Sequence, residues 1–263
     1  MTAVASQVKP GLDIGKVIGP TFQIYGRNFV PFVLLGLVMS GIPQLLVGFF
    51  QVRYATGGAA ALQSLGPTGI LSFIGVGLVL AVMLMILGVL FQAGIIRSTV
   101  AEMKGEKSDL AQNIQKSLSD VPGLLGLLIL TGFGIFGAML LLFVPGIMLA
   151  VAWSVSLPAR VIEGPGVSKA FGRSLALTRG RRWMIFLLMV LFYIAMGALS
   201  SVALGLSGGF LAGQKSPLRL LLFQPLISVV VYPLIPVGLA VLYYQLRASR
   251  EGPELDNLAS VFE

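Results

Sequence analysis

Six long apolar stretches constrain this chain more than any other feature of its sequence. A helix needs about 20 apolar residues to cross the roughly 30 Å of hydrocarbon in a bilayer. Only 11% of the residues are charged, against about 25% in soluble domains. We therefore predict an all-α integral membrane protein with six transmembrane helices. The predicted spans are residues 29–50, 69–96, 122–143, 146–162, 183–206 and 218–246.

The third and fourth spans are predicted from one unbroken apolar region, residues 122–162. This region is too long for a single crossing. Proline ends a helix and glycine accepts the backbone of a turn, so we place the turn at residues 143–146, around Pro145 and Gly146. A single re-entrant span here would invert the C-terminal third of the chain.

Lysine and arginine are distributed unevenly between the loops. With the N-terminus inside, only Arg53, Lys215 and Arg219 of the 18 basic residues lie outside. Cytoplasmic loops carry such an excess of basic residues. An odd number of spans would put the two basic ends on opposite sides, so the bias also favours six. We predict a multi-pass membrane protein with both termini in the cytoplasm.

A short amphipathic segment precedes the first, third and fifth spans. Apolar residues in each segment recur at the spacing of one helix face, although Pro20 counts against a straight helix in the first. We expect these helices to lie in the plane of the lipid headgroups. Their apolar stripes are Ile14, Ile18, Phe22 and Tyr25, then Leu110, Ile114, Leu118 and Val121, then Val167, Phe171 and Leu175.

The segments divide the chain into three similar units. Each unit is predicted to be a cytoplasmic amphipathic helix followed by a transmembrane hairpin, within a single membrane domain. The units cover about 12–96, 108–162 and 166–246, and a cytoplasmic tail follows at 247–263. The alternative is that the three segments are not repeats, because any linker beside a membrane looks amphipathic.

The chain contains no histidine and no cysteine. This composition removes the commonest general base and metal ligand and the thiol nucleophile. We expect no enzymatic activity, no metal site and no cofactor. The net charge of +8 is concentrated beside apolar runs, so anionic phospholipid, not nucleic acid, is the expected counterpart.

No charged residue falls well inside a predicted span. The polar side chains at depth are amides, hydroxyls and phenols, which serve interhelical hydrogen bonds or line a polar substrate path. We favour the first interpretation because coupled transporters usually carry an ionisable relay. The best candidates for the second are Gln92, Gln224 and Tyr232.

The segment between the fourth and fifth spans is the most basic part of the chain. Each Lys or Arg near an anionic surface contributes about 1 kcal/mol to membrane binding, and a tryptophan marks the interface. We expect this segment to bind lipid headgroups or a partner, although topology determination alone needs no ligand. The candidates are Lys169, Arg173, Arg179, Arg181, Arg182 and Trp183.

One sequence pattern resembles a known family. The pattern consists of Pro145-Gly146-Ile147, Pro158, Glu163-Gly164, Ala170, Arg173-Ser174, Leu177 and Gly180. It is similar to the bacterial family named for the membrane domain of glycerophosphoryl diester phosphodiesterases, and to related uncharacterised six-span inner-membrane proteins. The resemblance implies a six-span helical domain in a bacterial inner (plasma) membrane. The chemistry of that family belongs to a separate barrel domain that needs histidine, so no activity is carried over.

Together these features predict a non-catalytic membrane protein. We expect it to bind lipid, a partner membrane-protein complex or a second copy of itself, as an accessory or scaffold subunit. The alternative is a small transporter, channel or lipid-translocating protein. A continuous polar cavity lined by Gln92 and Gln224 would favour transport, and a dry bundle with an exposed apolar flank would favour a partner role.

Overall fold

The computed structural model describes residues 13–55, 66–106, 108–206, 225 and 228–251, and this part of the chain is helical without a strand. Six of its helical segments are long and apolar enough to cross a membrane, which confirms the predicted class and number of spans. They are Phe29–Gly48, Thr68–Met103, Val121–Leu141, Phe143–Glu163, Arg182–Val202 and Ser228–Glu251. Gln224 and the predicted start of the sixth span lie outside the described residues.

The first span bends at a π-helical turn. It consists of α2 (Phe29–Gly36), the π-helix η1 (Leu37–Gly41) and α3 (Ile42–Ala55). Pro43 has no N–H to donate to the carbonyl of Met39, four positions earlier, so a regular α-helix cannot pass this point with all its bonds. The wider π turn takes up this break.

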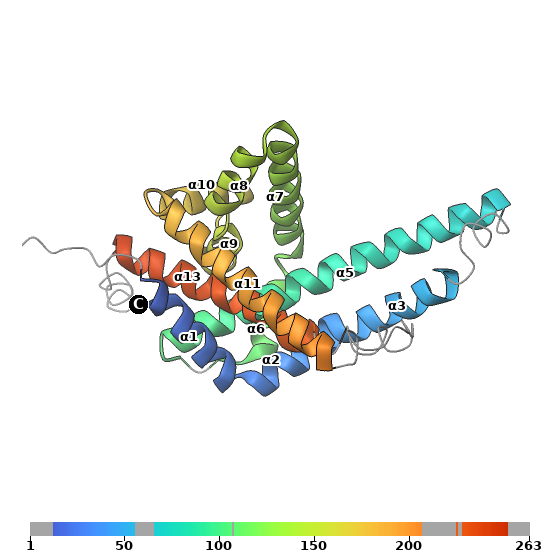
Figure 1. Ribbon diagram of the computed structural model, residues 1–263, viewed down its shortest axis with the longest axis horizontal. Helices are drawn as coiled ribbons and strands as arrows, with labels where there is room; N and C mark the ends of the chain where they lie inside the picture. Colours follow the sequence, from blue (N-terminus) through green and yellow to red (C-terminus); the bar gives the residue numbers. More distant parts are fainter. Residues whose placement is uncertain (1–12, 56–65, 107, 207–224, 226–227, 252–263) are drawn as a thin grey trace, which may run out of the picture.

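The second span is a single helix, α5 (Gly66–Met103), of 38 residues. It extends beyond the predicted range of 69–96 at both ends. At 1.5 Å per residue it is about 57 Å long, which exceeds the hydrocarbon thickness. Together with α3 it forms a hairpin that projects far from the rest of the molecule (Figure 1).

The turn between the third and fourth spans lies earlier than predicted. α7 (Val121–Leu141) is followed by a single residue with an extended backbone, Leu142. α8 (Phe143–Ala152) begins directly after it. The prediction at residues 143–146 is therefore wrong by a few positions. Pro145 belongs to the first turn of α8, where the backbone N–H needs no helical partner and proline is accepted.

The fourth span is a broken helix, where one continuous span over 146–162 was predicted. α8 ends at Ala152, and α9 (Ser156–Glu163) begins after a three-residue turn. α9 ends at Gly164, whose left-handed φ of 68° closes the helix as glycine commonly does. The break has a signal in the sequence, because Pro158 has no N–H to donate to the carbonyl of Ser154, four positions earlier. Pro158 lies in the first turn of α9, where proline is accepted.

Three more helices follow the fourth span in the described part of the chain. α10 (Val167–Thr178) follows α9, and α11 (Arg182–Leu206) forms the fifth span. The sixth span turns at Tyr232 and Pro233 and continues as α13 (Leu234–Glu251). Residues 247–251 were predicted as tail but extend this helix.

The three amphipathic helices are present, but their buried faces differ from the predicted stripes. On α1 (Ile14–Arg27), Phe22 is 49% exposed, while Val17, Thr21 and Ile24 are buried. The helix also passes through Pro20 without interruption. Since α1 packs against α13, protein contacts and not headgroups select its buried face.

The other two amphipathic helices also pack against protein. α6 (Leu110–Leu118) contacts α5, and α10 contacts α9, α13, α7 and α8. The predicted residues Leu118 and Leu175 are exposed, whereas Ser117 and Ser174 are buried. The order of helices recurs three times, but each amphipathic helix has different neighbours, so the three-repeat architecture stays a prediction.

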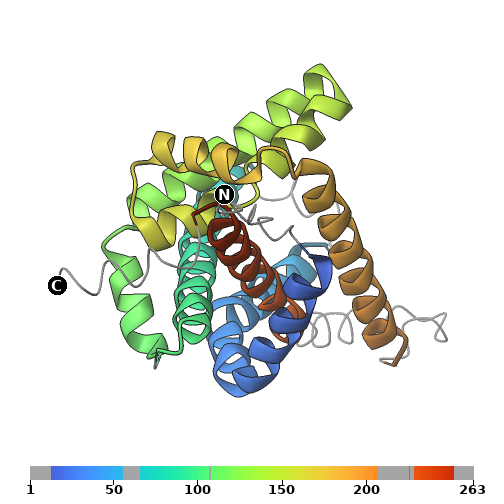
Figure 2. The ribbon, with the colours of Figure 1, turned by 90° about the vertical axis from the view of Figure 1, so that its left-hand side faces the viewer.

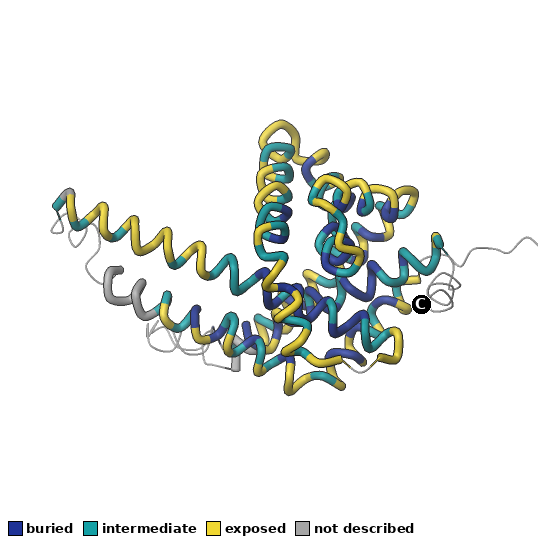
Figure 3. Tube along the Cα trace, turned by 180° about the vertical axis from the view of Figure 1, so that it is seen from behind, coloured by how far each residue is buried: buried dark blue, intermediate teal, exposed yellow. Residues whose placement is uncertain are grey.

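The hairpins diverge from a common centre. α13 lies at this centre beside α1 (Figures 1 and 2), and its buried residues Tyr243 and Leu246 join the main core with Phe32 and Ile95. The α7–α8 hairpin leaves the centre in a different direction from the α3–α5 hairpin (Figure 1). The outer half of α5 is largely exposed although it is apolar (Figure 3), as expected of a lipid-facing surface.

Candidate functional site

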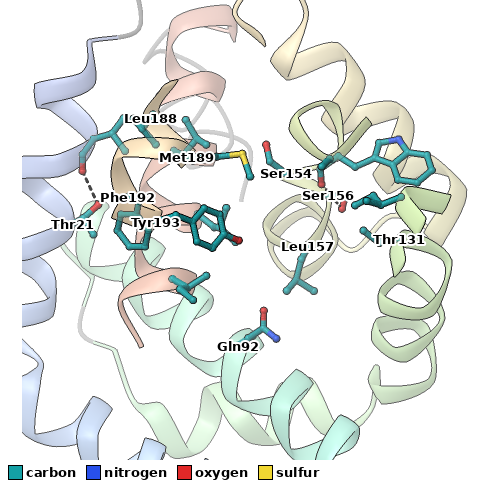
Figure 4. A pocket seen from close by; sticks show the side chains of 18 of the residues that line it. Thr21, Gln92, Thr131, Ser154, Ser156, Leu157, Leu188, Met189, Phe192 and Tyr193 are labelled. Carbon is teal, nitrogen blue, oxygen red and sulfur yellow. Dashed lines mark hydrogen bonds between the residues drawn. The ribbon is translucent and has the colours of Figure 1, made fainter. Parts of the chain in front are cut away.

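A cavity of about 290 Å³ lies where the hairpins diverge (Figure 4). This volume is close to the lower end of small-molecule sites, about 300 Å³, and about twice the 150 Å³ cavity known to hold benzene. Its walls are mainly apolar and come from α1, α5, α7, α8, α9, α11 and α13. The larger apolar residues are Leu127, Leu128, Ile135, Leu157, Leu188, Met189, Phe192, Leu239 and Leu242.

Most hydroxyl groups around the cavity are satisfied within their own helix or turn. Thr21 donates to the carbonyl of Val17 at 2.6 Å, and Thr131 donates to that of Leu127 at 2.7 Å. Because these hydroxyl protons are already donated to backbone carbonyls, they are not available to a ligand. Gln92 of α5 projects its amide toward the cavity from below in Figure 4.

Two buried polar groups at the cavity lack a partner in the described part of the chain. They are the Ser154 hydroxyl and the indole N–H of Trp153. Both belong to the turn that separates α8 from α9. Buried polar groups are nearly always hydrogen-bonded. The Ser154 hydroxyl on the cavity wall is therefore available to bond a ligand in the cavity.

Neighbouring helices hold this turn in place. The Trp153 ring packs on Phe171 of α10 with ring centroids 4.4 Å apart, and a Cβ atom at Gly134 of α7 would overlap it. Ser174 of α10 donates a hydrogen bond to the carbonyl of Ala152. The break in the fourth span is therefore a packed feature of the fold.

The structure brings four of the predicted headgroup residues together. Arg179, Arg181, Arg182 and Trp183 line an open depression of about 640 Å³ between α10 and α11, completed by Gly180, Met184 and Met148. We call this the basic depression. Arg181 donates to the Ser249 hydroxyl at 2.6 Å, and Trp183 is 84% exposed. The Arg182 Nε atom is buried and has no hydrogen-bond partner among the described residues.

The structure places Arg173 elsewhere. Its guanidinium bonds Glu163 at 2.8 Å and also pairs with Glu251, which bonds Arg247 at 3.0 Å. Tyr243 donates to Glu163 at 2.7 Å. Burial alone would lower the pKa of Arg173, but hydrogen bonds and charge attraction from the two glutamates raise it above its ordinary value. This cluster joins α9, α10 and α13.

The remaining predicted residues occupy separate positions. Lys169 is exposed on α10 and does not line the basic depression, and Tyr232 is 45% exposed and does not line the cavity. Because Gln224 is outside the described residues, a polar path between Gln92 and Gln224 stays a prediction.

The residues of the family pattern lie at structural joints. Gly146 packs against Met139 at the α7–α8 hairpin, and Pro158 is buried in α9. Glu163 bonds Arg173, and Ser174 bonds α8. These positions lie within or beside the broken fourth span, whereas Gly180 of the same pattern lines the basic depression.

Sequence reasoning missed the cavity itself. Ser154 is visible in the sequence as a serine inside an apolar stretch, as several others are. Its position four residues before Pro158 signals a break in the helix, but not a cavity. The cavity walls come from seven helices, and no local pattern reports such a meeting. No protein-family model, curated protein or solved structure matches the chain.

Proposed function

We propose that this chain is a non-catalytic membrane protein that binds a membrane lipid, with hydrocarbon in the cavity between its spans. The observation that carries this proposal is the apolar lining of the cavity. Transfer of hydrocarbon into an apolar site is favourable by about 25 cal/mol per Å² of buried area, whereas a polar solute would lose hydration there without gaining partners.

The cavity lining favours lipid binding over ion-coupled transport. No Asp, Glu, Lys or Arg is among the described residues that line the cavity. An intramembrane ionisable group is the usual mark of an ion or proton path. A polar substrate would find few hydrogen-bond partners here. The cavity offers the amide of Gln92 and a few hydroxyls, most of which already donate to backbone carbonyls.

An accessory role is compatible with the outer surface. The window of α5 that is most apolar is only 11% buried within the chain. A large apolar flank of this kind is available to bulk lipid or to the helices of a partner membrane protein. The cavity would then hold a lipid that stays bound to the protein, whereas the flank of α5 would contact bulk lipid or a partner.

The test compares cavity-filling variants with a matched surface variant. Ala150→Phe and Thr131→Phe place a ring at the cavity from α8 and α7, whereas Ala81→Phe adds the same ring to the exposed part of α5. After gentle detergent extraction, native mass spectrometry counts the bound lipids. We expect the wild type and Ala81→Phe to retain a lipid that both cavity variants lose.

Two results would contradict the proposal. One is a wild-type protein that is always extracted without lipid. The other is full lipid retention in both cavity variants, with thermal unfolding midpoints equal to that of the wild type, which would show that the ring occupies the cavity without displacing anything.

A further inference from the structure

We infer that the cavity and the basic depression are two ends of one binding site, which holds an anionic phospholipid with its phosphate at Arg179 and Arg182 and one acyl chain in the cavity. This inference rests on the proposed lipid binding and adds the polarity, charge and position of the lipid. It is carried by three observations: the course of α11, two arginines without a carboxylate partner among the described residues, and the buried hydroxyl of Ser154.

The two pockets follow one another along a single face of α11. Met184 borders the basic depression, and Leu188 and Phe192, each four residues further on, border the cavity. At 1.5 Å per residue, Leu188 lies about 9 Å and Phe192 about 15 Å along the axis from Arg182. Half of the hydrocarbon core is also about 15 Å thick, so a chain that starts at the head of α11 reaches Phe192.

The head of α11 is suited to an anion. The helix begins at Arg182, and the first backbone N–H groups of a helix lack carbonyl partners and carry a partial positive charge. No Asp or Glu is among the described residues that line the depression. A phosphate brings acceptor oxygens to guanidinium groups and to the free N–H groups at the head of α11.

The arginines of the basic segment fall into two groups. The charge of Arg173 is neutralised by Glu163 and Glu251. Within the described ranges, the guanidinium groups of Arg179 and Arg182 have no carboxylate partner, and the Arg182 Nε is buried without an acceptor. Guanidinium binds phosphate through paired charge-assisted hydrogen bonds, which is the interaction that Arg182 lacks.

The Ser154 hydroxyl adds a donor on the cavity wall, which it shares with Met189 of α11 (Figure 4). It is buried and unpartnered. Ester carbonyls lie between the phosphate and the chains of a phospholipid and can accept this bond, whereas a hydrocarbon cannot. The cavity volume of about 290 Å³ fits part of one chain, which leaves the second chain in the surrounding bilayer.

The test uses two photoreactive lipids with the same diazirine-bearing acyl chain. One is a phosphatidylglycerol, and the other is the uncharged diacylglycerol. Each is reconstituted with the full chain in nanodiscs, and cross-linked peptides are mapped by mass spectrometry. The variant Arg179→Gln/Arg182→Gln removes the two charges of the basic depression that have no carboxylate partner among the described residues. Lys16→Gln/Lys116→Gln removes two exposed charges elsewhere.

We expect phosphatidylglycerol to label peptides that contain Ser154 or Met189 in the wild type and in the lysine variant. In the arginine variant this labelling should fall about tenfold, since one lost charge-assisted interaction of about 1.4 kcal/mol already gives that factor. Diacylglycerol labelling of the same peptides should stay unchanged. Arg179→Lys/Arg182→Lys keeps the charge and should restore part of the phosphatidylglycerol signal.

The outcomes separate this inference from the proposed function. Cavity labelling by both lipids that is insensitive to the arginine variant overturns the shared site but leaves lipid binding intact. An equal loss of both lipids in the arginine variant also overturns the assignment of the headgroup. If neither lipid labels the cavity peptides in the wild type, the proposed function is overturned as well.

Discussion

Ser174 of α10 donates a hydrogen bond of 2.8 Å to the carbonyl oxygen of Ala152, the last residue of α8. The carbonyl of Ala152 needs this donor because the N–H of Ser156, four residues later, bonds Trp153 instead. The Thr178 hydroxyl also lies 3.3 Å from this oxygen, but its single proton is nearer the carbonyl of Ser174, at 2.9 Å. In a membrane protein, a break in a helix is tolerated when neighbouring side chains satisfy the freed backbone groups.

Replacement of Ser174 by alanine should therefore destabilise the fold. We expect Ser174→Ala to lower the free energy of unfolding by about 1–3 kcal/mol, the usual cost of a buried acceptor that loses its donor. The measurement is equilibrium unfolding in mixed micelles, with Ser168→Ala on the exposed side of α10 as the control. Equal stability of the two variants would mean that the bond does not hold the break.

The α7–α8 hairpin depends on the absence of a side chain at Gly146. A Cβ atom there would lie 2.9 Å from the backbone N and Cα of Met139, and backbone cannot move as a flexible side chain can. We expect Gly146→Ala to cost roughly 1–3 kcal/mol of stability, as overpacking does. Gly132→Ala on α7 has open space and should be neutral or stabilising by up to about 1 kcal/mol. A neutral Gly146→Ala would show that the hairpin can open freely.

The ion-pair cluster predicts that Arg173 acts on stability and not on lipid. Arg173→Gln should cost roughly 1–2 kcal/mol, less than the 3–5 kcal/mol of a fully buried pair, because about a quarter of each partner's side chain is exposed. Lipid retention by native mass spectrometry should be unchanged, as for Lys169→Gln. Lipid loss in folded Arg173→Gln protein would return Arg173 to the headgroup site that the sequence alone predicts.

The two tryptophans should respond differently to quenchers in the membrane. Trp183 is 84% exposed at the basic depression, whereas Trp153 packs on Phe171. In the single-tryptophan variants Trp153→Phe and Trp183→Phe, we expect lipids brominated near the headgroup to quench Trp183 strongly and Trp153 weakly. Anionic lipid should also shift Trp183 emission to shorter wavelength. Equal quenching of the two would place Trp183 away from the interface.

The helices themselves could be predicted because a bilayer imposes simple requirements on local sequence. Uninterrupted apolar length identifies a span, and the six predicted spans correspond to six observed helical segments. The ends of the helices were predicted less accurately than their number. The turn at Leu142 precedes Pro145, because proline is tolerated in the first turn of the helix that follows it. The arginine-rich segment was also visible, since charge beside apolar runs is a local property.

The candidate site required the tertiary structure. The sequence by itself determined that the chain is helical, apolar and basic between its fourth and fifth spans, because these properties depend on composition and short-range spacing. Pro158 also disfavours a continuous fourth span through Ser154. Only the packing decided that Glu163 and Glu251 neutralise Arg173, and that a cavity remains where the hairpins diverge. These features depend on residues far apart in the sequence, such as Tyr243 with Glu163, 80 positions apart, or Val17 and Leu242 on the walls of the same cavity. No periodicity in the sequence records such contacts.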